Sequence, residues 1–204
     1  MRIGLLGGAF NPPHEGHLKL ARLALEHLDL DELRLVPTAL SPHKPDPGGP
    51  PAETRLRLLA QALEGSDPRC RVEPLELERG GTSYTVDTLE TLAAREPGSA
   101  WILVMGSDQL AGLPGWRRVT RIFELASAAV ALRPGSAMGL SPLPGLRIVD
   151  RWSGAAGELV TLPGTDLDLA STELRERLQA APREDPGGLP PQVLGTIRSE
   201  NLYR

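Results

Sequence analysis

Short apolar runs alternate with helix-like segments along most of the chain, and this alternation limits the folds that the sequence can adopt. Runs such as RIGLL (2–6) and WILVMG (101–106) have the length and apolar content of buried strands. The segment HLKLARLALEHL (17–28) repeats apolar residues with the spacing of one face of an amphipathic helix. Strands that alternate with helices favour an α/β fold, with a doubly wound parallel sheet covered by helices on both faces.

The same patterns give the expected bounds of each element. Strands are expected at 2–6, 32–38, 71–78, 101–106, 127–133, 146–152 and 158–163. Helices are expected at 17–28, 53–65, 83–96, 117–126 and 171–178. Pro74 makes the run 71–78 an edge or bulged strand, because proline cannot donate to a sheet ladder. We expect a single domain over 1–204, in which 166–204 form a small helical part.

Composition excludes several classes of protein. The chain has 204 residues and a formal net charge of −4, which gives no general reason to expect nucleic-acid binding. No apolar run is long enough for a membrane span, and the N-terminal run does not resemble a secretory signal. Cys70 is the single cysteine, so an internal disulfide is excluded and a cytoplasmic location is expected. The oligomeric state stays open, with a homo-oligomer as one option.

The stretch GGAFNPPHEGH (7–17) lies between the first strand and the first helix. Gly7 and Gly8 let a ligand approach the backbone closely, and a helix N-terminus attracts anions. His14 and His17 stand three residues apart at the mouth of that helix, where both can donate to one phosphate. The sequence therefore favours a phosphate-binding entrance.

Two other interpretations of these histidines stay open. They could form a helix-capping pair without a ligand, or they could bind zinc. The remaining candidate zinc ligands, His27, His43 and Cys70, show no ligand spacing, which disfavours zinc.

GGAFNPPHEGH resembles the G-G-x-F-[DN]-P-x-H-x-G-H signature of the HxGH nucleotidyltransferase superfamily, with Asn11 where aspartate is common. STELR (171–175) is similar to that superfamily's second signature, although Ala170 replaces a frequent serine. Taken alone, STELR could be a plain capping box. Together the two signatures imply a Rossmann-like nucleotidyltransferase fold and attack on the α-phosphate of a nucleoside triphosphate.

Further segments narrow the resemblance. TSYTVDTL (82–89), GSDQLAGLPGW (106–116), ALRPG (131–135) and VLGTIRSENLY (193–203) resemble the bacterial nicotinate-nucleotide adenylyltransferase family. That resemblance implies adenylyl transfer from ATP to nicotinate mononucleotide, giving deamido-NAD and pyrophosphate, a step of NAD biosynthesis. Three alternatives remain: nicotinamide mononucleotide as acceptor, pantetheine phosphate as acceptor, or a non-catalytic nucleotide-binding sensor with the same fold.

The resemblance also implies roles for individual residues. It implies that His14, His17 and Arg175 are catalytic. It implies ATP binding by Gly7, Gly8, Phe10, His17, Lys44, Gly106, Asp108, Ser171, Thr172 and Arg175. It implies nicotinate-nucleotide binding by Thr85, Trp116 and Arg133.

Chemistry makes these assignments reasonable. An indole can stack on a pyridinium ring, and an arginine can hold a phosphate. Core packing of Trp116 and a solvated Arg133 are the competing interpretations. Because no lysine lies in the Thr85 and Trp116 segments, we expect a carboxylate there to be bound by backbone amides. Lys44 lies in a proline-rich segment, 41–53, which we expect to be mobile and to order over bound nucleotide.

The expected mechanism needs no protein nucleophile, because the acceptor phosphate is already ionised. The histidines would act as electrostatic donors and not as general bases. We expect a Mg²⁺ cofactor held mainly by the ATP phosphates and water, with no metal-ligating residues of the protein.

Overall fold

The computed structural model describes residues 1–42, 48–132, 145–163 and 169–204. Its strands are β1 (Arg2–Gly8), β2 (Glu32–Pro37), β3 (Cys70–Val72), β4 (Ala100–Gly106), β5 (Ala126–Ala131), β6 (Arg147–Ile148) and β7 (Glu158–Leu162). Its helices are α1 (Glu15–His27), α2 (Ala52–Ala62), α3 (Leu75–Arg79), α4 (Thr85–Arg95), α5 (Ser107–Leu110), α6 (Val119–Leu125), α7 (Ser171–Ala180) and α8 (Pro191–Ser199). A short 3₁₀ helix, η1 (Leu113–Gly115), follows α5.

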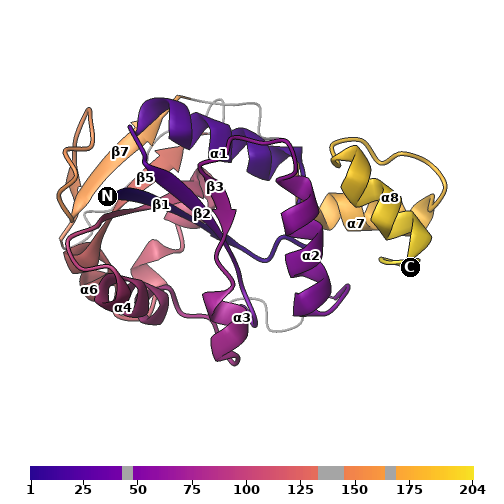
Figure 1. Ribbon diagram of the computed structural model, residues 1–204, viewed down its shortest axis with the longest axis horizontal. Coiled ribbons are helices and arrows are strands. Elements are labelled where there is room, and N and C mark those ends of the chain that lie inside the picture. The colour runs from indigo at the N-terminus through magenta and orange to yellow at the C-terminus, as the bar shows by residue number, and fades with distance from the viewer. Residues whose placement is uncertain (43–47, 133–144, 164–168) are drawn as a thin grey trace.

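The strands form one parallel sheet in the order β3-β2-β1-β4-β5-β7-β6 (Figure 1). From β1 the chain moves outward through β2 to β3, and then returns to β4 on the other side of β1. The strand order therefore switches between β1 and β4. Ligands of doubly wound sheets bind beside such a switch, at the carboxyl ends of the strands. The α/β fold expected from the sequence is confirmed.

The apolar strands are buried on both faces, as their sequences require. On β4, Ile102 and Val104 pack with the apolar face of α1. Trp101, Leu103 and Met105 alternate with them and pack on the opposite face, with α4 and α6. The run WILVMG lacks polar residues because neither face of this central strand meets water.

Two expected strands differ in the structure. The expected strand 71–78 ends as β3 at Val72, and residues from Leu75 form α3 instead. Pro74 immediately precedes α3, where its fixed φ and missing N–H fit the start of a helix. The expected strand 146–152 is reduced to β6, whose two residues, Arg147 and Ile148, are both exposed at the edge of the sheet.

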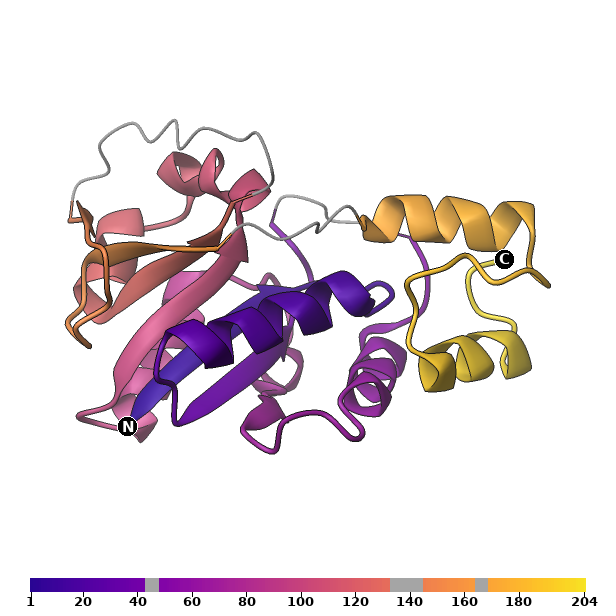
Figure 2. The ribbon, with the colours of Figure 1, turned by 90° about the horizontal axis from the view of Figure 1, so that it is seen from above.

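The C-terminal helices α7 and α8 lie to one side of the sheet and pack against α2 (Figure 2). Their shared apolar cluster includes Leu58 of α2, Leu174 of α7 and Val193 of α8, all at most 1% exposed. This cluster fixes the position of α7, and therefore of the STELR signature at its start.

Candidate active site

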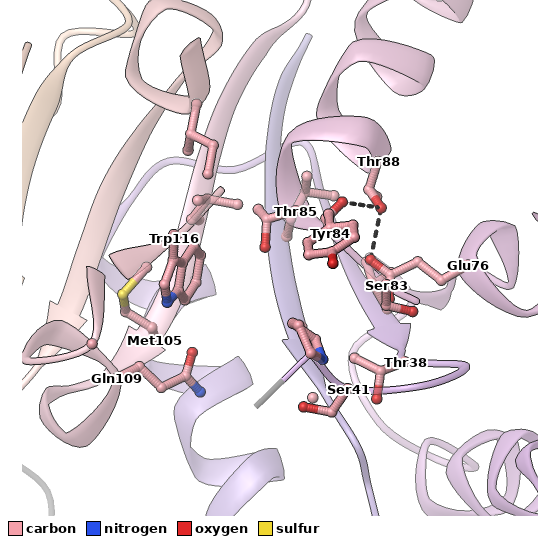
Figure 3. Close-up of a pocket in the computed structure, with 18 of the residues that line it drawn as sticks. Thr38, Ser41, Glu76, Ser83, Tyr84, Thr85, Thr88, Met105, Gln109 and Trp116 are labelled. Carbon is pink, nitrogen blue, oxygen red and sulfur yellow. Dashed lines mark hydrogen bonds between the residues drawn. The ribbon is translucent and has the colours of Figure 1, made fainter. Parts of the chain in front are cut away.

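A pocket of about 830 Å³ opens where the carboxyl ends of β1, β2 and β4 meet (Figure 3). It lies at the switch in strand order, where a ligand is expected in this class of fold. The pocket is lined by five residues that the sequence predicted to bind substrates: Gly7, Gly8, Thr85, Asp108 and Trp116. They come from separate segments, so the fold brings the two halves of the predicted site together.

The two glycines differ in their surroundings. A Cβ on Gly8 would lie 3.5 Å from the ring of Phe10, an ordinary contact distance. A Cβ on Gly7 would meet no atom within 4 Å. Packing within the chain therefore does not require glycine at position 7. Close approach of a ligand to the backbone remains the expected reason for it.

Trp116 and Thr85 line the pocket from the segments that flank it (Figure 3). Trp116 directly follows η1 and is half-buried, with part of its indole packed on the core cluster beneath α4 and α6. The side chain therefore packs on the core and also lines the pocket, and its stacking on an acceptor ring stays a prediction. Thr85 is the first residue of α4, where backbone N–H groups have no partner within the helix.

Asp108 lies on the short helix α5, directly after β4. Its carboxylate folds back towards the strand end, and a Cβ on Gly106 would lie only 2.6 Å from Oδ1 of Asp108. A side chain at position 106 would therefore displace the carboxylate. Both residues lie at the end of β4 beside the pocket, and of the two only Asp108 lines it, so their binding of ATP stays a prediction.

His14 and His17 stack at the start of α1, with their ring centroids 3.8 Å apart. The backbone N–H of His14, the N-cap residue, donates to Nδ1 of His17 at 3.2 Å. The capping interpretation is therefore correct as local structure. It also sets the chemistry, because an Nδ1 that accepts leaves the neutral ring's proton on Nε2 as a donor.

Burial keeps both imidazoles neutral at physiological pH. It lowers the pKa of His14 to about 4. Burial also lowers the pKa of His17 well below its usual value, and the neighbouring His14 lowers it further. In the free protein, both rings are therefore neutral hydrogen-bonding groups.

Neighbouring residues hold this pair in place. The ring of Phe10 lies 4.8 Å from that of His17 and is fully buried, so its side chain supports the histidine and does not line the pocket. The backbone of Phe10 is left-handed, with a φ of 46°, a conformation that residues other than glycine adopt uncommonly. A Cβ on Gly16 would come within 2.9 Å of the His14 ring, which explains the glycine between the two histidines.

The second signature meets the first, although about 160 residues separate them in the sequence. Nη1 of Arg175 donates to the carbonyl oxygen of Asn11 at 2.8 Å, and Nη2 donates to Oγ1 of Thr172 at 3.2 Å. Oγ of Ser171 donates to the carbonyl oxygen of Pro12 at 3.3 Å. The start of α7 thus lies against the histidine-bearing turn, which gathers the predicted catalytic residues in one place.

A buried carboxyl group that the sequence did not point to also lines the pocket. Glu76 is 6% exposed, and its Oε1 accepts a hydrogen bond of 2.7 Å from the Thr88 hydroxyl (Figure 3). Burial raises the pKa of Glu76, while hydrogen bonds from Thr88 and Ser83 oppose this rise. Nothing in the sequence indicated that Glu76 is buried, because an edge strand was expected over 71–78 and an acid on such a strand would be exposed.

Arg55 of α2 is a second residue that sequence reasoning missed. It is 5% exposed, and its guanidinium donates to the carbonyl oxygens of Ala9 at 2.5 Å and Thr38 at 2.8 Å. Burial lowers its pKa. Arg55 ties the end of β2 to the turn after β1. The sequence did hold a signal for this burial, because Arg55 falls on the apolar face of the helix, three and four residues before Leu58 and Leu59.

Lys44 and Arg133 lie outside the described residues, as does the central part of the expected mobile segment 41–53. Within the described ranges, no group of three or more histidine, cysteine, aspartate or glutamate residues is arranged to hold a metal ion. None of the helices in those ranges has the length and apolar character needed to cross a membrane.

Comparisons with known proteins agree with this geometry. Residues 5–177 match the family model described as cytidylyltransferase-like. The whole chain is 38% identical to a probable nicotinate-nucleotide adenylyltransferase of Trichlorobacter lovleyi, over 215 aligned residues and the full length of both proteins. It is 39% identical to the probable nicotinate-nucleotide adenylyltransferase of Bordetella avium, covering all of this chain and 98% of the other.

Solved structures show the same fold. Nicotinic acid mononucleotide adenylyltransferase of Plasmodium falciparum, complexed with NaAD, superposes with a TM-score of 0.74 at 17% identity, covering 99% and 97% of the two chains. A putative nicotinate-nucleotide adenylyltransferase of Vibrio parahaemolyticus gives a TM-score of 0.68 at 19% identity, covering 100% and 95%.

Proposed function

The chain belongs to the nicotinate-nucleotide adenylyltransferases, within the cytidylyltransferase-like family, and we propose that it transfers the adenylyl group of ATP to nicotinate mononucleotide. An oxygen of the acceptor's 5′-phosphate attacks the α-phosphorus of ATP. The bond from that phosphorus to the oxygen bridging to the β-phosphate breaks, and pyrophosphate leaves. The other product is deamido-NAD, so the reaction is a step of NAD biosynthesis.

One observation carries this proposal furthest. The glycines of the turn after β1, Asp108 after β4, Thr85 of α4 and Trp116 line one pocket, although the sequence assigned them to two different substrates. A reaction between two nucleotides needs both in one cavity, with the reacting phosphates close together.

The residues that act on the phosphates would do so by position and charge. The incoming phosphate is already a nucleophile, so no side chain has to be activated. Neutral His17 would donate from Nε2 to a phosphate oxygen as charge develops on it, and His14 would support the same anion. Arg175 would bring a guanidinium to the polyphosphate from the start of α7.

The metal and the residues outside the described ranges complete the proposal. Mg²⁺ would be bound mainly by the triphosphate and water, where it supplies charge neutralisation. Lys44 would bind ATP and Arg133 the acceptor phosphate, as their sequence segments imply. A cytoplasmic location, expected from the single cysteine, belongs to the same proposal.

Pyrophosphate release tests the function directly. The purified protein would be incubated with ATP, Mg²⁺ and one of three acceptors: nicotinate mononucleotide, nicotinamide mononucleotide or pantetheine phosphate. We expect the highest kcat/KM with nicotinate mononucleotide. Turnover mainly with another acceptor would reassign the enzyme, and ATP binding without turnover on any of them would favour a sensor.

A further inference from the structure

Arg117 is a cationic residue at the pocket whose role is not explained by either sequence signature. It follows Trp116 directly and lines the same pocket. Its guanidinium carbon lies 4.5 Å from the centroid of the Tyr84 ring, within the range of a cation–π contact. Tyr84 is the N-cap residue of α4, so Arg117 is held beside the start of that helix.

The acidic residues around Arg117 leave its charge available. The nearest is Asp87 in the first turn of α4, whose Oδ2 is 3.9 Å from Nη1 of Arg117. The two side chains are 54% and 34% exposed, and an ion pair this long and this exposed contributes little. The other carboxyl groups lining the pocket, Asp108 and Glu76, belong to α5 and α3.

Two sources of positive potential therefore meet on one side of the pocket. The N-terminus of α4 presents backbone N–H groups at Thr85, and Arg117 adds a full charge on the face of Tyr84. A pyridine ring stacked on Trp116 would carry its substituent in the same part of the pocket. A carboxylate there gains from both sources, whereas a carboxamide, which is neutral, gains little from the charge.

We propose that Arg117 is a specificity-determining residue, whose guanidinium on Tyr84 favours an acceptor nucleotide bearing a pyridine carboxylate over the corresponding carboxamide. This inference rests on the proposed adenylyl transfer. It replaces the expectation that backbone amides alone bind the carboxylate. That expectation rested on the absence of lysine from these segments and did not include Arg117, the residue after Trp116.

The acid and amide acceptors make a sharp test, because they share ribose and phosphate and differ only in the ring substituent. The experiment measures kcat/KM for both acceptors at saturating ATP on wild type, Arg117→Ala and Arg117→Lys. Arg121→Ala is the matched control, since Arg121 pairs with Glu90 and Glu124 and is not among the residues lining the pocket.

For Arg117→Ala we expect kcat/KM for the acid to fall by about tenfold, mainly through KM, and kcat/KM for the amide to change less than about twofold. Arg117→Lys should recover part of the acid preference, because it keeps the charge without the planar fork. The acid preference of wild type should shrink between about 0.05 M and 0.5 M salt, as expected for a half-exposed charge.

Equal losses for both acceptors would overturn the inference, since Arg117 would then act on their shared phosphate or on the fold. An unchanged acid-to-amide ratio in Arg117→Ala would overturn it too. So would an equal change of the ratio in Arg121→Ala, which would point to net charge alone. Failure of the proposed function itself would show in wild type, which would then turn over neither pyridine nucleotide or would turn over mainly the amide.

Discussion

At the scale of single residues, the proton on His17 is placed by a backbone group. The N–H of His14 occupies Nδ1 of His17, so the neutral ring can donate only from Nε2. Each imidazole is also buried, and the pKa of each is lowered. A donor that is neutral and fixed in direction costs no reorganisation when charge develops on the phosphate.

Replacing His17 by alanine is therefore expected to lower kcat by about 10²–10³, the usual cost of losing one donor to a developing charge. The KM for the acceptor should change little, because Trp116 and Thr85 lie elsewhere in the site. His27→Ala, an exposed histidine at the end of the same helix, serves as the control and should keep full turnover. Near-normal kcat in His17→Ala would contradict the assignment.

The lowered pKa of His14 predicts how stability depends on pH. The unfolded chain takes up the His14 proton near pH 6.5, whereas the folded protein takes it up only near pH 4. This contribution to stability is fully present above pH 6.5 and is lost as the pH falls to about 4. The loss is of the order of 3 kcal/mol.

Denaturant unfolding at several pH values tests this, with His14→Asn compared with wild type. The raised pKa of Glu76 acts in the opposite sense and the lowered pKa of His17 in the same sense. Burial, the main cause of both shifts, is common to the two proteins and cancels in the difference. We expect the variant to be less stable at neutral pH and its deficit to shrink between pH 6.5 and 4. A deficit that stays constant with pH would show that His14 does not resist protonation.

At the scale of elements, the buried Glu76 joins α3 to α4 and to the end of β2. Its Oε1 accepts from Thr88 of α4, and the Thr88 oxygen in turn accepts from Arg79 of α3 at 3.2 Å. Ser83, which also bonds Glu76, accepts from the backbone N–H of Ala39 just beyond β2. The start of α4, where Thr85 meets the pocket, is held by these bonds.

Thr88→Val should therefore lower the free energy of unfolding by about 1–3 kcal/mol, because it removes one of the two side-chain donors to a buried carboxyl group at nearly constant volume. Thr91→Val is the matched control on the same helix. Among the residues that the structure describes, Thr91 bonds only the Asp87 carbonyl one turn back, so its loss should cost much less. Urea unfolding measures the loss in free energy of unfolding for each variant. Equal losses would contradict the inference that the bonds around Glu76 stabilise the start of α4.

The elements that the sequence predicts well are those whose pattern is local. The runs at β1 and β4 and the amphipathic face of α1 needed no knowledge of the fold. The segment that forms α3 did need it, because the alternating apolar and polar residues of RVEPLELE match a strand, and the segment is too short to show a helical period. Packing of Leu75 and Glu76 beneath α4 decided the outcome.

At the scale of the molecule, the sequence supplied both signatures but not their contact. Nothing local to STELR places Arg175 on the Asn11 carbonyl, since that contact depends on α7 packing with α2 and α8. The buried Arg55 shows the same limit. Its partners, the carbonyls of Ala9 and Thr38, are backbone atoms brought together only by the sheet.

The predicted site has two ends: the histidine pair, which is not among the residues lining the pocket, and Trp116, which is. This division predicts separable effects. Trp116→Ala should raise the KM for both the acid and the amide acceptor, because stacking acts on the ring and not on its substituent. The KM for ATP should stay nearly unchanged, since the turn after β1 and the start of α7 do not depend on the indole. Trp116→Phe keeps a smaller aromatic face, so its KM for each acceptor should lie between those of Trp116→Ala and wild type.

Steady-state kinetics with each substrate varied in turn measures these constants. A rise in the KM for ATP equal to that for the acceptor would mean that Trp116 supports the whole pocket through its packing on the core, and that the two ends are not independent.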